Sequence, residues 1–322
     1  MVGDRVLYFD GDVAATRVAK RALVASGCDV TTVARAAELS AEDLSGYAVV
    51  VLAVDGAEGG ATALMDLIDG AAELFPKTRL LLQVRESSEL CVEWMSRKPH
   101  LCHVQAKWGA SLDSAELVAT TAKLLRRDLF GLEKYLPWGA ARHRLIVSDS
   151  RDKARYVREV SALATRLGCS ERIVELVEVV VDELSTNAIF NAPRDDAGKP
   201  RHAHRNRREA VVLQEHERAE LTYAFDGTYF AVALRDPFGA LSRETVVSYL
   251  HRCLKQTPDQ LPGAGGAGMG LFRTYRALSK LVINIRPGAL TEVIGLIDLR
   301  LSIKQFKQQP KSLHLFVEEP EA

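Results

Sequence analysis

The chain has 322 residues, of which 47% are apolar and 26% charged, with 42 Lys and Arg against 42 Asp and Glu. At roughly 100–200 residues per domain, this length predicts two domains with enough apolar residues for two cores. Because the formal net charge is zero, no general attraction to phosphate backbones exists and we expect no nucleic-acid partner. No apolar run approaches the roughly 18 residues of a membrane span and no signal peptide is evident, so we expect a cytoplasmic protein without a membrane partner. The five scattered cysteines are typical of reduced thiols and do not form a zinc motif.

Residues 5–125 alternate short apolar runs with helical stretches. Strands are predicted over residues 5–9, 30–33, 48–54, 80–84 and 101–105, and helices over 13–26 and 114–127. The third strand is apolar at every position, which is typical of a strand buried on both faces. The pattern predicts a flavodoxin-like parallel sheet whose functional residues lie at the carboxyl ends of the strands.

Those strand ends carry Asp10 and Asp12, Asp55, and Lys107. Clustered carboxylates suit Mg²⁺, and a fixed lysine suits a phosphoryl group. The arrangement resembles the receiver domain of bacterial response regulators. The resemblance implies that Asp10 and Asp12 hold Mg²⁺, that Asp55 accepts a phosphoryl group and that Lys107 pairs with it.

Two features leave the chemistry of this domain open. Gly11 occupies the second acidic position of the family, and Gln83 the position of its hydroxyl residue. The acceptor position falls on either Asp55 or Ala53, because a shift of two residues preserves the face of a strand. A degenerate receiver that serves as a docking or dimerisation surface is therefore the alternative to a working phosphoacceptor.

The second half begins with a predicted strand over residues 144–147 and a helix over 151–167, capped by Asp149 or Ser150. A further helix is predicted over 171–191. The dipeptide Asp226-Gly227 lies between strands 221–225 and 229–234 and predicts a hairpin. A polar connection over 240–262 leads into a glycine run over 263–270, a helix to residue 278, and strands over 281–286 and 291–299.

Three motifs follow one another along this half. Glu183 and Asn187 are four residues apart and share one side of a helix. Asp236 ends a strand, and the glycine run opens a helix whose N–H groups can face an anionic group.

Residues 140–300 thereby resemble the GHKL (Bergerat) ATP-binding fold, a two-layer α/β sandwich, and within it the anti-sigma-factor serine kinases. The resemblance implies that Asn187 holds Mg²⁺, that Glu183 is the base, and that Asp236 accepts a hydrogen bond from the adenine amino group. Further nucleotide-binding positions implied by the resemblance are Gly239, Gly266, Gly268, Gly270 and Thr291. The connection 240–262 would be a lid over the triphosphate.

The sequence thus predicts a receiver-like domain over 1–127, a connector over 128–143, an ATP-binding domain over 144–305 and a tail over 306–322 that adds an edge strand. The family resemblances imply a signalling protein that binds Mg-ATP and acts as a serine/threonine kinase in a partner-switching or phosphorelay circuit. The partners implied are an antagonist or sigma-factor-like regulator and a second copy of the chain. Because Phe238 and Ala240 replace glycines of the first glycine box, a non-catalytic, nucleotide-gated scaffold is the alternative.

A basic segment, residues 193–209, separates the Glu183 helix from the hairpin. Its cationic residues include Lys199, Arg201, Arg205, Arg207 and Arg208. Such a segment can clamp phosphates, bind an acidic partner, contact nucleic acid or simply be solvated.

Overall fold

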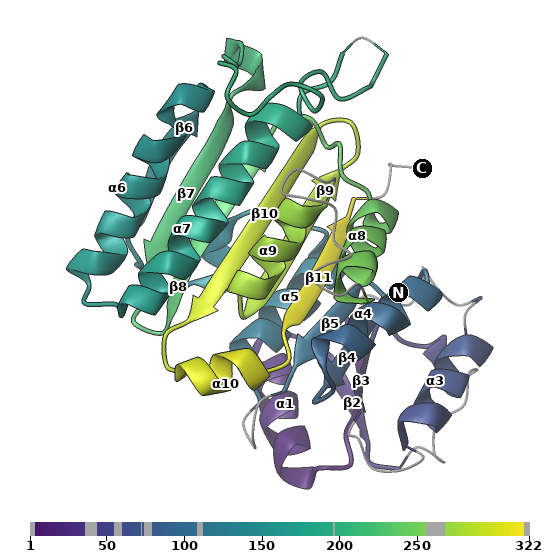
Figure 1. Cartoon of the computed structure of the whole chain (residues 1–322). Coiled ribbons are helices and arrows are strands. Elements are labelled where there is room, and N and C mark those ends of the chain that lie inside the picture. Colours follow the sequence, from purple (N-terminus) through teal and green to yellow (C-terminus); the bar gives the residue numbers. More distant parts are fainter. Residues whose placement is uncertain are drawn as a thin grey trace. The chain divides into compact units, whose positions relative to one another are not determined.

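In the computed structural model, the described residues are 4–35, 44–54, 60–71, 73, 79–107, 112–195, 197–255 and 268–318. The chain divides into two compact units (Figure 1). The first comprises Met1–Leu129 with Gln309–His314, and the second comprises Phe130–Gln308 with Leu315–Ala322. None of the helices in these described ranges is both long and apolar enough to span a membrane.

The first unit is built on a parallel sheet with the strand order β2-β1-β3-β4-β5. These strands are Asp29–Val33, Arg5–Phe9, Val49–Val54, Arg79–Val84 and His103–Ala106. All six residues of β3 are buried, as its unbroken apolar run predicts. This strand order is the flavodoxin-like one, so the parallel sheet that the sequence predicts for this part of the chain is confirmed.

In the described residues of this unit, the helices are α1 (Val13–Ala25), α3 (Gly60–Gly70), α4 (Ser88–Arg97) and α5 (Ser114–Arg126). Helices α1 and α5 contact each other, and their apolar side chains share a core with alternate residues of β1 and β3. The predicted tail strand is present as β11 (Ser312–Val317). Its residues Leu313 and His314 pair with Val104 and His103 of β5, so Gln309–His314 belong to the first unit.

The second unit contains an antiparallel sheet with the order β9-β10-β8-β7-β6. The strands are β6 (Arg142–Val147), β7 (Ala219–Phe225), β8 (Tyr229–Asp236), β9 (Lys280–Arg286) and β10 (Leu290–Asp298). Figure 1 shows three helices side by side over one face: α6 (Lys153–Arg166), α7 (Glu171–Thr186) and α9 (Met269–Ala277). Helix α6 follows a short 3₁₀ turn, Ser150–Asp152, which Asp149 caps.

Two local features differ from the sequence prediction. The helix predicted over 171–191 ends as an α-helix at Thr186 and continues as a π-helical turn over Asn187–Asn191. The predicted polar lid contains a helix, α8 (Arg243–Lys255), whose residues Val246, Leu250 and Cys253 are buried. A further helix, the short α10 (Ile303–Gln308), precedes β11.

The other face of the second sheet carries charged residues and contacts the connector. The Glu292 carboxylate is 3% exposed and accepts hydrogen bonds from the Gly131 N–H, Asn284 Nδ2 and Arg235 Nη2, each at 2.8 Å. A cavity of about 410 Å³ lies on this face, where Arg235 and Arg144 are ion-paired with Glu292 and Glu220. None of the predicted nucleotide-site residues lines this cavity.

Candidate functional site

The acidic pocket predicted in the first unit is closed by internal contacts. Asp10 is 1% exposed, and its Oδ2 lies 2.8 Å from Lys107 Nζ and 3.2 Å from the Tyr8 hydroxyl. Its Oδ1 accepts a hydrogen bond of 2.9 Å from the Asp12 N–H. The Tyr8 hydroxyl also lies 2.8 Å from Gln83 Oε1, so a polar network connects β1, β4 and the end of β5.

Asp12 has a local role in this structure. Its Oδ1 accepts hydrogen bonds from the N–H groups of Ala14 and Ala15, at 2.8 and 3.2 Å, and so caps α1. These hydrogen bonds hold the pKa of the Asp12 carboxyl below its usual value. The predicted phosphoacceptor Asp55 lies outside the described residues. The structure therefore brings Asp10 and Lys107 together, whereas the Asp12 carboxylate serves as a helix cap.

The second unit places the Glu183 and Asn187 side chains beside the start of α9. A Cβ atom added at Gly270 would lie 2.5 Å from Glu183 Oε2 and 3.6 Å from Asn187 Oδ1. Only glycine at position 270 allows this close approach without displacing the Glu183 carboxylate. Asn187 Oδ1 accepts a hydrogen bond of 2.7 Å from Asn191 Nδ2, so the π-helical turn orients the predicted Mg²⁺ ligand.

Two arginines that sequence reasoning did not assign lie near Glu183. Arg273 Nη1 of α9 forms an ion pair of 3.0 Å with Glu183 Oε1. Arg207 of the basic segment donates a hydrogen bond of 3.2 Å from Nη2 to Asn191 Oδ1. Arg273 lies three residues after the last glycine of the run, and this spacing could have indicated it. No local sequence pattern predicts that Arg207 contacts Asn191.

On the sheet of the second unit, Asp236 of β8 and Thr291 of β10 occupy directly paired positions. Both point to the helix-covered face, because they alternate with Arg235 and Glu292 along their strands. The Thr291 Oγ1 atom is buried and has no hydrogen-bond partner among the residues that the structure describes. Thr291 itself is 1% exposed, so this hydroxyl is an unsatisfied buried group next to the Asp236 carboxyl.

Asp236 is 7% exposed, and burial raises the pKa of its carboxyl to about 7. The Phe238 N–H, 3.1 Å from Oδ1, and the Arg194 guanidinium lower this pKa and only partly offset the effect of burial. Gly239 follows in the left-handed region, with φ +56°, and a Cβ there would lie 2.0 Å from the Arg286 carbonyl oxygen. The turn after β8 therefore requires glycine for steric reasons.

Of the glycine run, Gly268 and Gly270 are described and Gly266 lies outside the described residues. Gly268 has φ +91° and is the N-cap residue of α9, against the ring of Tyr249 from α8. The structure therefore brings Glu183, Asn187 and Gly270 together at the start of α9, and Asp236 and Thr291 together on the sheet.

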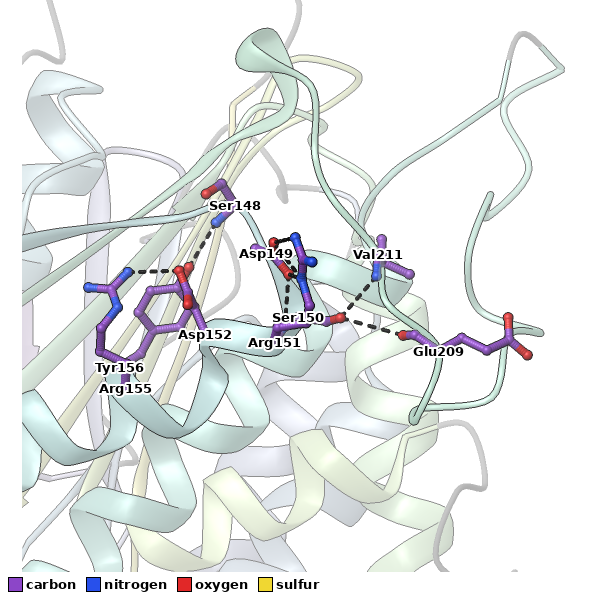
Figure 2. Close-up of polar contacts among 9 residues, drawn as sticks. All are labelled: Ser148, Asp149, Ser150, Arg151, Asp152, Arg155, Tyr156, Glu209 and Val211. Carbon is purple, nitrogen blue, oxygen red and sulfur yellow. Dashed lines mark hydrogen bonds and ion pairs between the residues drawn. The ribbon is translucent and has the colours of Figure 1, made fainter.

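The basic segment is held at both ends. Arg201 forms an ion pair with Glu217, which is 1% exposed. Figure 2 shows the other end: the Ser150 hydroxyl accepts a hydrogen bond of 2.9 Å from the Val211 N–H and lies 3.4 Å from the Glu209 carbonyl oxygen. These contacts attach the segment to the start of α6, so a fully solvated loop does not describe it.

No family model and no curated protein matches the sequence. Among solved structures, a putative pilus assembly-related protein from Burkholderia pseudomallei is 18% identical, with 39% of this chain and 92% of that chain covered and a TM-score of 0.32. A response regulator receiver domain protein from Clostridium thermocellum is 13% identical, with 38% and 95% covered and a TM-score of 0.32. A response regulator receiver protein from Dyadobacter fermentans is 15% identical, with 37% and 96% covered and a TM-score of 0.27.

Each of these likenesses covers less than two fifths of this chain, with a TM-score below 0.5. Their identities and TM-scores are too low for any ligand or activity to be carried over to this chain. The fold of the first unit is therefore assigned from its own strand order.

Proposed function

We propose that the second unit binds Mg-ATP and that the chain is a signalling protein of the anti-sigma-factor serine/threonine kinase type. The observation that carries this proposal is the buried Thr291 hydroxyl, which has no hydrogen-bond partner within the described part of the chain and lies directly across the sheet from the buried Asp236. A buried hydroxyl without a partner costs about 1–3 kcal/mol, so such a group favours a ligand that satisfies it.

An adenine ring supplies what these two side chains lack. Its amino group donates a hydrogen bond to the Asp236 carboxylate, and its ring nitrogens accept from a hydroxyl or through a water. The binding of a donor to the ionised carboxylate compensates for the burial that raises the pKa of Asp236. Two polar groups on an apolar wall are also typical of small-molecule sites.

The phosphate end of the proposed site is formed by Glu183, Asn187 and the start of α9. Exposed N–H groups of a helix N-terminus and a close glycine approach favour phosphate oxygens. Mg²⁺ bound to the phosphates would neutralise charge that develops during transfer, and Asn187 Oδ1 would hold it.

In the proposed transfer, the oxygen of a serine or threonine hydroxyl forms a bond to the γ-phosphorus of ATP. The bond between that phosphorus and the bridging oxygen breaks, which leaves ADP, and Glu183 receives the hydroxyl proton. The substrate would be a small antagonist protein, and a sigma-factor-like regulator or a second copy of the chain would be a further partner. These partners come from the family resemblance of residues 140–300.

A second candidate function has its own observations. The Glu183 carboxylate is ion-paired with Arg273, which competes with a role as base, and the acidic pocket of the first unit is internally satisfied. Both features favour a nucleotide-gated scaffold that binds ATP without transferring its phosphate.

Titration with Mg-ATP by calorimetry tests the binding proposal on the wild type and Thr291→Val. This variant keeps the shape of the side chain and removes only the hydroxyl that has no partner. We expect binding to be about fivefold to tenfold weaker, from the loss of one hydrogen bond, with no loss of thermal stability. Thr222→Val, on the opposite face of the same sheet, is the matched control and should bind normally. A wild type that binds no Mg-ATP would refute the proposal.

The same samples distinguish the two candidate functions. A kinase releases ADP and labels a protein substrate, and Glu183→Gln reduces both without abolishing binding. Binding without turnover, unchanged in Glu183→Gln, supports the scaffold instead.

A further inference from the structure

We propose that the basic segment 193–209 supplies Arg207 as a binding residue for the phosphates of the nucleotide. This inference rests on the proposed function of the second unit and deepens it. In this inference, the segment 193–209 allows the site to select a charged nucleotide over the uncharged nucleoside.

Arg207 reaches the Glu183–Asn187 region through two direct contacts. Its guanidinium carbon lies 4.5 Å from the centre of the Phe190 ring, and Nη2 donates the hydrogen bond of 3.2 Å to Asn191 Oδ1. Asn191 in turn donates to Asn187 Oδ1 at 2.7 Å. A short chain of hydrogen bonds therefore connects Arg207 to the predicted Mg²⁺ ligand.

The charges around this contact are unbalanced. Desolvation lowers the pKa of the Arg207 guanidinium, whereas the negative charge of the Glu183 carboxylate raises it. Glu183, however, is already ion-paired with Arg273. Within the described part of the chain Arg207 forms no ion pair of its own, so two guanidinium groups face a single carboxylate. An anionic ligand would restore the balance.

The basic segment that carries Arg207 is attached to other elements of the second unit on both sides of this residue. Two residues further on, the Glu209 carbonyl lies beside the Ser150 hydroxyl, and the Val211 N–H and carbonyl both bond to Ser150 (Figure 2). At the start of the segment, Arg194 Nη2 donates to the Ala240 carbonyl oxygen at 3.4 Å, next to the Asp236 turn. The segment is thus attached to the turn before α6 on one side and to the turn after Asp236 on the other.

The chemistry of the side chain fits a phosphate. A guanidinium remains charged at all physiological pH values and presents paired N–H donors that match two phosphate oxygens. Contact with an aromatic face orients its plane before the ligand arrives. Arg205 and Arg208 of the same segment are exposed, as Arg207 is, and serve as internal controls because the same charge is removed from each.

The test is a calorimetric titration of the full chain with Mg-ATP and, separately, with adenosine, at fixed ionic strength. Wild type, Arg207→Ala, Arg207→Lys and Arg208→Ala are compared. We expect Arg207→Ala to weaken Mg-ATP binding about tenfold or more, from the loss of a charged hydrogen bond, while adenosine binding is unchanged. Arg207→Lys should lie between wild type and Arg207→Ala, and Arg208→Ala should stay within about twofold of wild type.

Equal behaviour of Arg207→Ala and Arg208→Ala towards Mg-ATP would overturn the inference while leaving nucleotide binding intact. A parallel loss of adenosine binding in Arg207→Ala and Arg207→Lys would also overturn it, because the effect would then be on the fold of the site. A wild type that binds neither ligand would refute the proposed function, and this inference with it.

Discussion

The two predicted ligand sites treat their buried polar groups in opposite ways. In the first unit, both oxygens of the Asp10 carboxylate are hydrogen-bonded, and Lys107 supplies the opposite charge. In the second unit, one oxygen of Asp236 accepts a hydrogen bond from a backbone N–H. Among the described residues, Asp236 forms no ion pair and the Thr291 hydroxyl across from it has no partner. Both sites occur where sequence motifs predict a ligand.

The difference distinguishes a polar network that stabilises the fold from a receptive site, by which we mean one whose buried polar groups are left for a ligand to satisfy. A buried charge that its own fold satisfies stabilises one arrangement and offers little to a ligand. A buried group that the fold leaves unsatisfied lowers stability until something binds. We therefore propose nucleotide binding for the second unit and not for the first, whose Asp10 carboxylate is already hydrogen-bonded on both oxygens.

The largest effect we expect concerns the Asp10–Lys107 pair. Lys107→Met removes the ammonium and leaves the carboxylate buried, which should lower the free energy of unfolding of the first unit by about 3–5 kcal/mol. Hydrogen exchange of the β1 and β4 amides measures this locally. Arg97→Met removes the cation of an exposed ion pair with Glu93 and should cost less than about 1 kcal/mol.

The double variant Asp10→Asn with Lys107→Met should recover most of that loss, since no uncompensated charge remains. If Lys107→Met costs no more than Arg97→Met, the network does not stabilise the unit. The contrast between a satisfied and a receptive site would then fail.

A smaller effect is expected at the turn that follows Asp236. Gly239→Ala places a Cβ atom against the Arg286 carbonyl oxygen and forces a left-handed backbone, so we expect a loss of about 3 kcal/mol in the free energy of unfolding. Gly288→Ala is the control, because its φ is +71° but no atom lies within 4 Å of the new Cβ. It should lose only about 1 kcal/mol in urea unfolding. Equal losses would show that the close approach at position 239 is relieved by movement of the turn.

Much of the fold could be predicted from local patterns. The apolar run of β3 has no polar position, which only a strand covered on both faces tolerates, and the alternation of such runs with helices predicts a parallel sheet. Helix α8 was missed although its signal is present: Ser242 caps it, and Val246, Leu250 and Cys253 recur at helical spacing. The helical spacing of these apolar residues is hard to see because the surrounding residues, 240–262, are mostly polar.

The partners of the site residues could not be predicted in this way. Glu183 and Arg273 are 90 positions apart, and Asn191 and Arg207 are 16 apart across an insertion of no regular period. The pairing of β11 with β5 joins residues more than 200 positions apart. Such contacts depend on how elements pack, and a single sequence holds no pattern that reports them.

The smallest expected effect concerns the pH dependence of adenosine binding. Burial raises the pKa of the Asp236 carboxyl to about 7, from an ordinary value near about 3.9. In the absence of ligand, the folded protein therefore binds a proton that the unfolded chain releases, and this contribution to stability declines as pH rises through about 7. A ligand that donates a hydrogen bond to the ionised carboxylate has the opposite preference, so its binding below that pH must expel the proton.

Adenosine affinity should accordingly fall about tenfold between pH 8 and pH 6, by calorimetry, with one proton released on binding at the lower pH. Adenosine has no group that titrates in this range, so the slope reports the protein. Asp236→Asn removes the titrating group and should bind with a weaker affinity that does not change with pH. A flat profile in the wild type would place adenine away from Asp236, and an equal slope in Asp236→Asn would assign the proton to another side chain. Either result would contradict the claim that Asp236 of the second unit is left for a ligand to satisfy, and the contrast with Asp10 of the first unit would no longer hold.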